Sequence, residues 1–95
     1  MAVGDVFKNL ASVNAGAYLD IQPSAGVEVV IHNIYHESDI ELSVYDGTNS
    51  LVFDTDTGTG VYARYAFHVT NTQRIRVKNT AASVKLIGYD GVQTK

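Results

Sequence analysis

A chain of 95 residues without cysteine can form one small domain, with neither a disulfide nor a thiolate metal site. A net charge of −3 argues against nucleic acid and an anionic membrane as partners, and no apolar run approaches the roughly 20 residues of a spanning helix. Charged residues are 18% of the chain, below the typical share of about 25%, so we expect protein contacts to cover part of the surface.

Residues 1–16 are open to three interpretations, and none is a signal peptide, because the basic and apolar regions of such a peptide are missing. The three interpretations are a helix, a short strand at residues 10–13, and an extended arm that becomes ordered only against a neighbour. Gly4 and the lack of a strong cap make us favour a strand or an arm. The helix interpretation rests on four apolar residues with helical spacing, Val3, Val6, Phe7 and Leu10.

Residues 17–95 are predicted to form a single β domain, because their dominant hydrophobic period is two. Residues that favour turns separate the alternating segments. This pattern predicts an all-β fold, an antiparallel β-sandwich or jelly-roll-like small domain of about seven strands. The strands are expected at residues 17–22, 27–35, 40–45, 50–53, 61–70, 73–79 and 83–89.

The segment 61–70 alternates most clearly, and it is predicted to place Val61 inward and Tyr62 outward. Residues 70–73 suit a hairpin turn into the next strand. Between residues 40–45 and 50–53, the segment Asp46-Gly47-Thr48-Asn49 predicts a second turn.

A basic stripe is predicted on the strand at residues 73–79, where Ile75 and Val77 face inward. We expect either a solvated sheet face or a docking face for an acidic protein surface, and the acidic total charge disfavours nucleic acid. The outward cations are Arg74, Arg76 and Lys78, and Lys85 is predicted to extend the stripe from the adjacent strand.

No arrangement of side chains in the sequence indicates catalysis or a cofactor. The loop from Asp54 through Asp56 to Gly58 resembles half of a calcium loop, but the closing carboxylate is missing. His32 and His36 would lie about 13 Å apart along a strand, too far for one metal ion. There is no Gly-x-Ser-x-Gly motif, and the acidic residues at positions 37, 39 and 41 are typical of a solvated strand start. We therefore predict a protein that is not an enzyme.

The tyrosines are predicted to mark an interface. Tyr18, Tyr45 and Tyr62 fall on faces opposite the main apolar stripe, and tyrosine is enriched at protein interfaces. Carbohydrate stacking would give a similar pattern, so a module that recognises a host-surface sugar is an alternative. Its expected residues are Tyr45, Asp46, Asn49 and Asp54.

Five segments resemble small virion structural proteins of tailed bacteriophages, of the capsid decoration or cement type. They are AYLDIQP (17–23), VIHNIY (30–35), FHVTN (67–71), RVKNT (76–80) and IGYDGV (87–92). The resemblance implies a non-enzymatic protein on the outside of an icosahedral capsid. It further implies a homotrimer that binds the major capsid protein and stabilises the virion. The alternative to this function is a phage fibre or baseplate module that recognises a host-surface sugar.

From these patterns we expect a capsid or subunit interface that involves both the amino-terminal segment and the outward sheet residues. The apolar residues of the segment would pack on another subunit, because unpaired strand-like segments readily add to sheet edges. The residues expected at this interface are Val3, Val6, Phe7, Leu10, Tyr18, Tyr45, Tyr62, Arg74 and Arg76.

Overall fold

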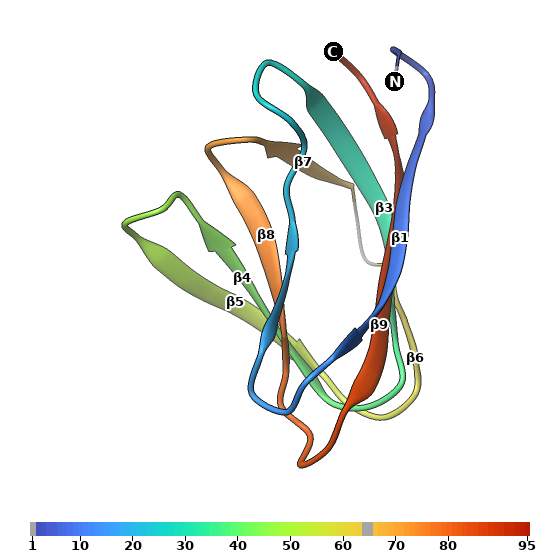
Figure 1. Cartoon of the computed structure of the whole chain (residues 1–95), viewed down its shortest axis with the longest axis vertical. Helices are drawn as coiled ribbons and strands as arrows, with labels where there is room; N and C mark the ends of the chain where they lie inside the picture. Colours follow the sequence, from blue (N-terminus) through green and yellow to red (C-terminus); the bar gives the residue numbers. More distant parts are fainter. Residues whose placement is uncertain (1, 64–65) are drawn as a thin grey trace.

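The computed structural model describes residues 2–63 and 66–95, and these residues form nine strands and no helix (Figure 1). Two antiparallel sheets pack against each other, which confirms the predicted all-β sandwich. No helix in the described residues could cross a membrane. The strands are β1 (Val6–Val13), β2 (Tyr18–Ile21), β3 (Glu28–His36), β4 (Ile40–Tyr45), β5 (Ser50–Asp56), β6 (Gly60–Tyr62), β7 (Phe67–Thr70), β8 (Arg74–Asn79) and β9 (Lys85–Gln93).

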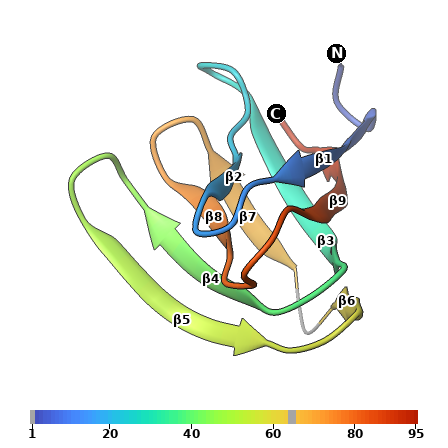
Figure 2. The same ribbon diagram turned by 60° about the horizontal axis from the view of Figure 1, so that its bottom comes forward.

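The five-stranded sheet has the order β1-β9-β3, and both β6 and β7 pair with β3. Strand β7 pairs with residues 28–31 at the start of β3, and β6 pairs with residues 34–36 at its end. The four-stranded sheet has the order β2-β8-β4-β5. Only the β4–β5 connection is a hairpin among the described strands, and this hairpin curves away from the other strands in Figure 2. Neighbours in the sheets are therefore mostly distant in the sequence.

The amino-terminal segment forms strand β1 instead of the helix that was one interpretation of its apolar spacing. The strand runs antiparallel to β9, from the pair Val6 and Val92 to the pair Val13 and Lys85. Phe7 points into the sandwich and stacks on Tyr89, with 5.5 Å between ring centres. The segment thus adds to a sheet edge of its own chain, which satisfies the backbone hydrogen bonds on the side that faces β9 without a neighbouring subunit.

The prediction of one strand at residues 61–70 was wrong, because β6 and β7 are separate strands. Tyr62 faces the core and is 3% exposed, whereas Val61 is 50% exposed, which reverses the predicted faces. The cause is the pairing of β6 with β3, which places Tyr62 opposite the buried Ile34. Phe67 and Val69 on β7 face inward as predicted. The remaining residues of that prediction, 64 and 65, lie outside the described residues.

The hairpin predicted at residues 70–73 was also wrong, because β7 and β8 belong to different sheets. A hydrogen bond from the Thr70 amide to the Gln73 carbonyl closes the turn at 2.9 Å, but the turn carries the chain across the sandwich. The β8–β9 connection crosses back in the same way, so Lys85 does not extend the basic stripe of β8. Turn chemistry identifies where the chain reverses, but it does not identify which sheet receives the next strand.

The core between the sheets is aliphatic, with one buried amide that links three segments. The Asn79 side chain is fully buried, and its Nδ2 donates to the carbonyls of Val13 at 2.8 Å and Ser83 at 2.9 Å. Its Oδ1 accepts from the Ala81 amide at 2.9 Å. Buried polar groups need such partners, so Asn79 fixes the end of β1 against the β8–β9 connection. The fully buried aliphatic residues include Ile21, Ile31, Ile34, Leu42 and Val77.

Candidate functional site

Four of the residues predicted at an interface come together on the outer face of the four-stranded sheet. Tyr18 lies on β2, Tyr45 lies on β4, and Arg74 and Arg76 lie on β8 between them. Their register places Tyr45 directly opposite Arg74. All four point outward because their neighbours along each strand, such as Ile75, point into the core. We call this set the tyrosine–arginine face.

Both guanidinium groups are stacked on tyrosine rings. The Cζ atom of Arg76 lies 4.0 Å from the centre of the Tyr18 ring and 4.5 Å from that of Tyr45. The Cζ atom of Arg74 lies 4.7 Å from the centre of the Tyr45 ring. These distances are within the range of cation–π attraction. The long arginine side chains are therefore held in place before any partner arrives.

One carboxylate, that of Asp20 on β2, lies between the two arginines. Its Oδ1 accepts a hydrogen bond from Arg76 Nε at 2.9 Å, and its Oδ2 lies 3.4 Å from Arg74 Nε. The second contact is an ion pair without a hydrogen bond, so the buried Nε–H of Arg74 has no acceptor among the described residues. Lys78 on β8 lies opposite Glu41 on β4. The outer face of this sheet therefore carries three cations, the two arginines and Lys78, and two carboxylates, those of Asp20 and Glu41.

The other predicted interface residues are distributed over the rest of the molecule. Val3, in the turn before β1, is exposed, as are Val6 and Leu10 on the outer face of the five-stranded sheet. Tyr62 is 3% exposed and packs in the core, so its prediction as a contact residue needs correction, whereas Phe7 is half-buried and packs against the core. An alternating pattern cannot locate these two residues unless the register of their strands is known.

The structure also shows an apolar patch that sequence reasoning missed. Leu10, Gly88, Tyr35 and Val61 lie side by side across four strands, and Leu86 is next to them on β9. The Cδ1 atom of Leu10 is 2.9 Å from the place where a Cβ atom of Gly88 would be, so the leucine side chain lies over the glycine. A glycine inside a strand was the signal for this close approach. We call the exposed side chains Leu10, Tyr35, Val61 and Leu86 the β1 patch.

Polar contacts anchor the aromatic residue of the β1 patch. The Tyr35 hydroxyl donates to the Asp90 carboxylate, which also accepts from Asn33 Nδ2 at 2.9 Å. This hydrogen bond to Asp90 raises the pKa of Tyr35 above its ordinary value of 10.0. Tyr35 is therefore a neutral donor at physiological pH, and its hydrogen bond to Asp90 fixes the position of its hydroxyl group.

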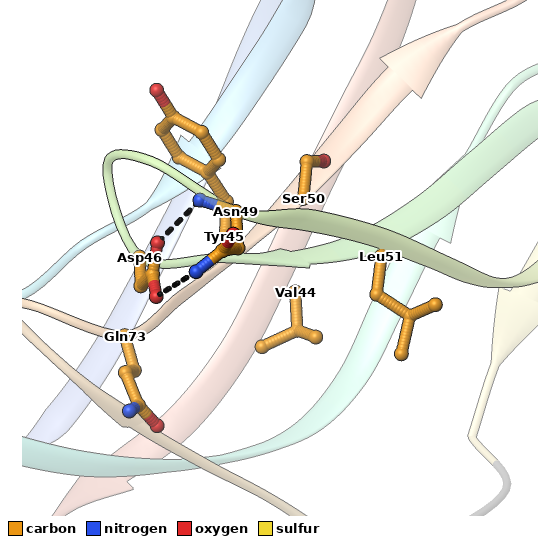
Figure 3. Close-up of a pocket in the computed structure, with 7 residues that line it drawn as sticks. All are labelled: Val44, Tyr45, Asp46, Asn49, Ser50, Leu51 and Gln73. Atoms are coloured by element: carbon orange, nitrogen blue, oxygen red, sulfur yellow. Dashed lines mark hydrogen bonds between the residues drawn. The ribbon is translucent and has the colours of Figure 1, made fainter.

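Three of the four residues expected to bind sugar, Tyr45, Asp46 and Asn49, line one pocket, and Asp54 does not. Figure 3 shows the pocket at the tip of the β4–β5 hairpin, where the side chains of Val44 and Leu51 lie on one side and the Tyr45 ring points to the other. The carboxylate of Asp46 is occupied by its own turn. Asp54 lies farther along β5 and accepts a hydrogen bond from the Tyr62 hydroxyl at 2.8 Å. The pocket thus lacks the second predicted carboxylate, and the ring of its Tyr45 points away from Val44 and Leu51.

Acid is expected to loosen the β4–β5 turn below pH 3.8. Hydrogen bonds from the Asn49 amide at 2.6 Å and the Thr48 amide at 2.9 Å, with a weaker one from Asn49 Nδ2, hold the pKa of Asp46 below its ordinary 3.8. A lowered pKa in the folded state means that the stabilisation is complete above pH 3.8 and is lost as the pH falls through the folded value.

The measurement is an NMR titration of the Thr48 and Asn49 amide shifts, with Asp46→Asn as the control that keeps an acceptor but cannot titrate. Amide shifts that titrate at or above pH 3.8 in the unmodified protein would contradict this account of the turn.

His36 is the buried histidine of the chain, and its ring joins two loops. Its Nδ1 lies 3.0 Å from the Ser38 carbonyl oxygen and 2.7 Å from that of Gly58, and its Nε2 lies 2.9 Å from Asp56 Oδ2. Carbonyl oxygens only accept hydrogen bonds, so Nδ1 carries a proton. His32 and His68 are exposed and lie elsewhere. In the described part of the chain, no group of three histidine, aspartate or glutamate residues converges to hold a metal ion.

No protein-family model matches this chain, and a search of the curated proteins finds no significant match. The function must therefore be argued from the surfaces themselves, of which the tyrosine–arginine face and the β1 patch are the most developed.

Proposed function

We propose that this chain is a non-enzymatic virion structural protein that decorates the outside of a tailed-bacteriophage capsid and stabilises it. Its proposed partner is the major capsid protein, and its proposed assembly state is a homotrimer. One observation carries the proposal: the tyrosine–arginine face has the composition and the order of a protein-docking surface. The resemblance of the five sequence segments to decoration proteins supports the choice of partner.

Tyrosine and arginine are the residues that most often dominate binding energy at protein interfaces. An arginine that must be ordered during binding loses side-chain entropy, which weakens the complex. Arg76 avoids most of this loss because two rings and Asp20 already hold its guanidinium group. A rigid, amphipathic face of this kind suits permanent attachment to a protein shell.

A decoration protein that trimerises needs a second surface for its sister subunits. The β1 patch supports this requirement, because it lies on the outer face of the opposite sheet and exposes large apolar groups, among them Leu10 at 65%. Burial of apolar area contributes about 25 cal/mol per Å². Contacts between subunits on this patch would leave the tyrosine–arginine face free for the capsid.

The proposal is tested on particles and on the purified protein. Mass spectrometry of purified phage heads is expected to find this polypeptide at a fixed copy number relative to the major capsid protein. Light scattering after size exclusion is expected to give about three times 10.3 kDa. Absence of the polypeptide from mature particles would reject the role in the virion, and a strict monomer would reject the self-standing trimer.

A carbohydrate-binding module of a phage fibre or baseplate is the second candidate, and the hairpin-tip pocket is the observation in its favour. The pocket presents Gln73, the half-buried side chain of Val44 and the exposed side chain of Leu51. Glycan-array binding that is lost on Gln73→Ala, without any association with particles, would favour this candidate over the structural role.

A further inference from the structure

We propose that the paired guanidinium groups of Arg74 and Arg76 form a carboxylate-binding site for an acidic segment of a protein partner. The inference rests on the proposed function only in taking the partner to be a protein, and it names the chemistry by which that partner is recognised. It applies to the same tyrosine–arginine face, on the outer side of β8.

Most hydrogen-bond donors of the two arginines are unused. Each guanidinium group has five N–H donors. Asp20 occupies the Nε edge of Arg76 and approaches that of Arg74, and neither Nη group of either arginine donates to a described residue. The Nε–H of Arg74 is buried and lacks a hydrogen bond in the described part of the chain. Because the Nε–H of Arg74 is buried, an acceptor supplied from outside would bind the Nη groups, which Asp20 leaves unoccupied.

The arrangement suits a planar acceptor. Arginine binds a carboxylate through two parallel N–H bonds, and this geometry is stronger and more specific than a single contact. Stacking between Tyr18 and Tyr45 fixes the plane of the Arg76 guanidinium, and Tyr45 also supports Arg74. Two neighbouring outward positions on one strand are about 6.6 Å apart by the strand rise. Two successive outward carboxylates on an extended acidic segment have a matching separation.

The surrounding charges favour a carboxylate-bearing protein over a nucleic acid. Asp20 and Glu41 lie among the three cations, so the face has a net charge of only +1, and the whole chain has −3. A phosphate backbone needs a continuous basic track to replace its counterions. A short acidic segment can instead place one or two carboxylates on the arginines and keep its other residues away from Asp20.

The probe for the test is the peptide acetyl-(Glu)₆-amide, titrated into the isotope-labelled full chain at low salt. We expect the Nε–Hε signals of Arg74 and Arg76 to shift. The double variant Arg74→Lys/Arg76→Lys keeps both charges but loses the paired N–H donors of each guanidinium group. We expect its affinity for the peptide to be about fivefold lower, or lower still. Lys8→Ala removes an exposed cation from the other sheet and is the matched control, with unchanged affinity. Affinity should also fall several-fold between 50 and 200 mM salt.

Specific outcomes overturn the inference. Unperturbed arginine signals in the unmodified protein, or equal affinity for the peptide in the lysine double variant, would reject the site. Inorganic phosphate or an oligothymidylate that binds there as tightly as the peptide would reject its preference for a carboxylate-bearing protein. The arginine signals of the unmodified chain keep the test decisive even if the double variant unfolds.

The same variants separate this inference from the proposed function. If the peptide binds the arginines but the chain never associates with phage heads, the carboxylate site stands and the role in the virion fails. If the lysine double variant co-purifies with heads as well as the unmodified protein, and the peptide does not bind, the role stands and the carboxylate site fails.

Discussion

Replacing Gly91 with alanine is expected to lower the free energy of unfolding by about 3 kcal/mol or more. A Cβ atom at this position would lie 2.0 Å from the Val30 carbonyl oxygen and 2.8 Å from the Ile31 Cα atom. Both are backbone atoms of the adjacent strand β3, which cannot rotate away as a side chain can. The pairing of β3 with β9 shifts register just beyond this point, between Ile31 and Asn33, so the close approach belongs to a β-bulge.

The measurement is urea denaturation of the purified protein, and Gly60→Ala is the matched control. No atom lies within 4 Å of the place where a Cβ atom would be at Gly60, and its backbone is not in the left-handed region. The control is therefore expected to unfold at an unchanged urea concentration. Equal stability of the two variants would contradict the close contact between β9 and β3.

Replacing His36 with alanine is expected to destabilise the fold by about 2–3 kcal/mol. The ring is 4% exposed, and its two nitrogens contact Ser38, Gly58 and Asp56. The substitution leaves a cavity and removes the ring's bridge between the β3–β4 turn and the β5–β6 loop. Asp56 is partly exposed, so water can replace the ring as its partner, and this limits the loss of unfolding free energy.

His68→Ala is the control for this second substitution, since His68 is an exposed histidine on β7. Thermal and urea unfolding of both variants should show a clear shift for His36→Ala and little change for His68→Ala. Hydrogen exchange of the Gly58 amide, which donates to Asp39 Oδ1 at 2.9 Å, should also accelerate in the His36 variant. If both variants are as stable as the unmodified protein, the ring does not hold the two loops together.

Alternation of apolar and polar residues was sufficient to predict the sandwich and most of its strands. It located Ile75 and Val77 in the core because a strand buried on one face must alternate. It could not decide between helix and strand for β1, because residues four apart, such as Val6 and Leu10, share a face in both structures. It also failed for Tyr62, whose face depends on its pairing with β3.

The candidate site was predictable only as a set of outward residues. The sequence places Tyr18, Tyr45 and Arg76 on polar strand faces, but these residues are neighbours only because β8 lies between β2 and β4. Strand order is a long-range property that local periodicity does not contain. The bonds of His36 to the β5–β6 loop were missed for the same reason, since Gly58 follows it by 22 residues.

The central position of β9 in its sheet has a consequence for biosynthesis. This strand lies between β1 and β3, yet the ribosome makes it after the other eight. Until it emerges, the edges of β1 and β3 that it will cover have no partner in the native sheet, and exposed strand edges of nascent chains invite aggregation. This sheet should therefore form only once β9 has emerged, and its folding should be slow, on the millisecond-to-second scale of proteins dominated by non-local pairing.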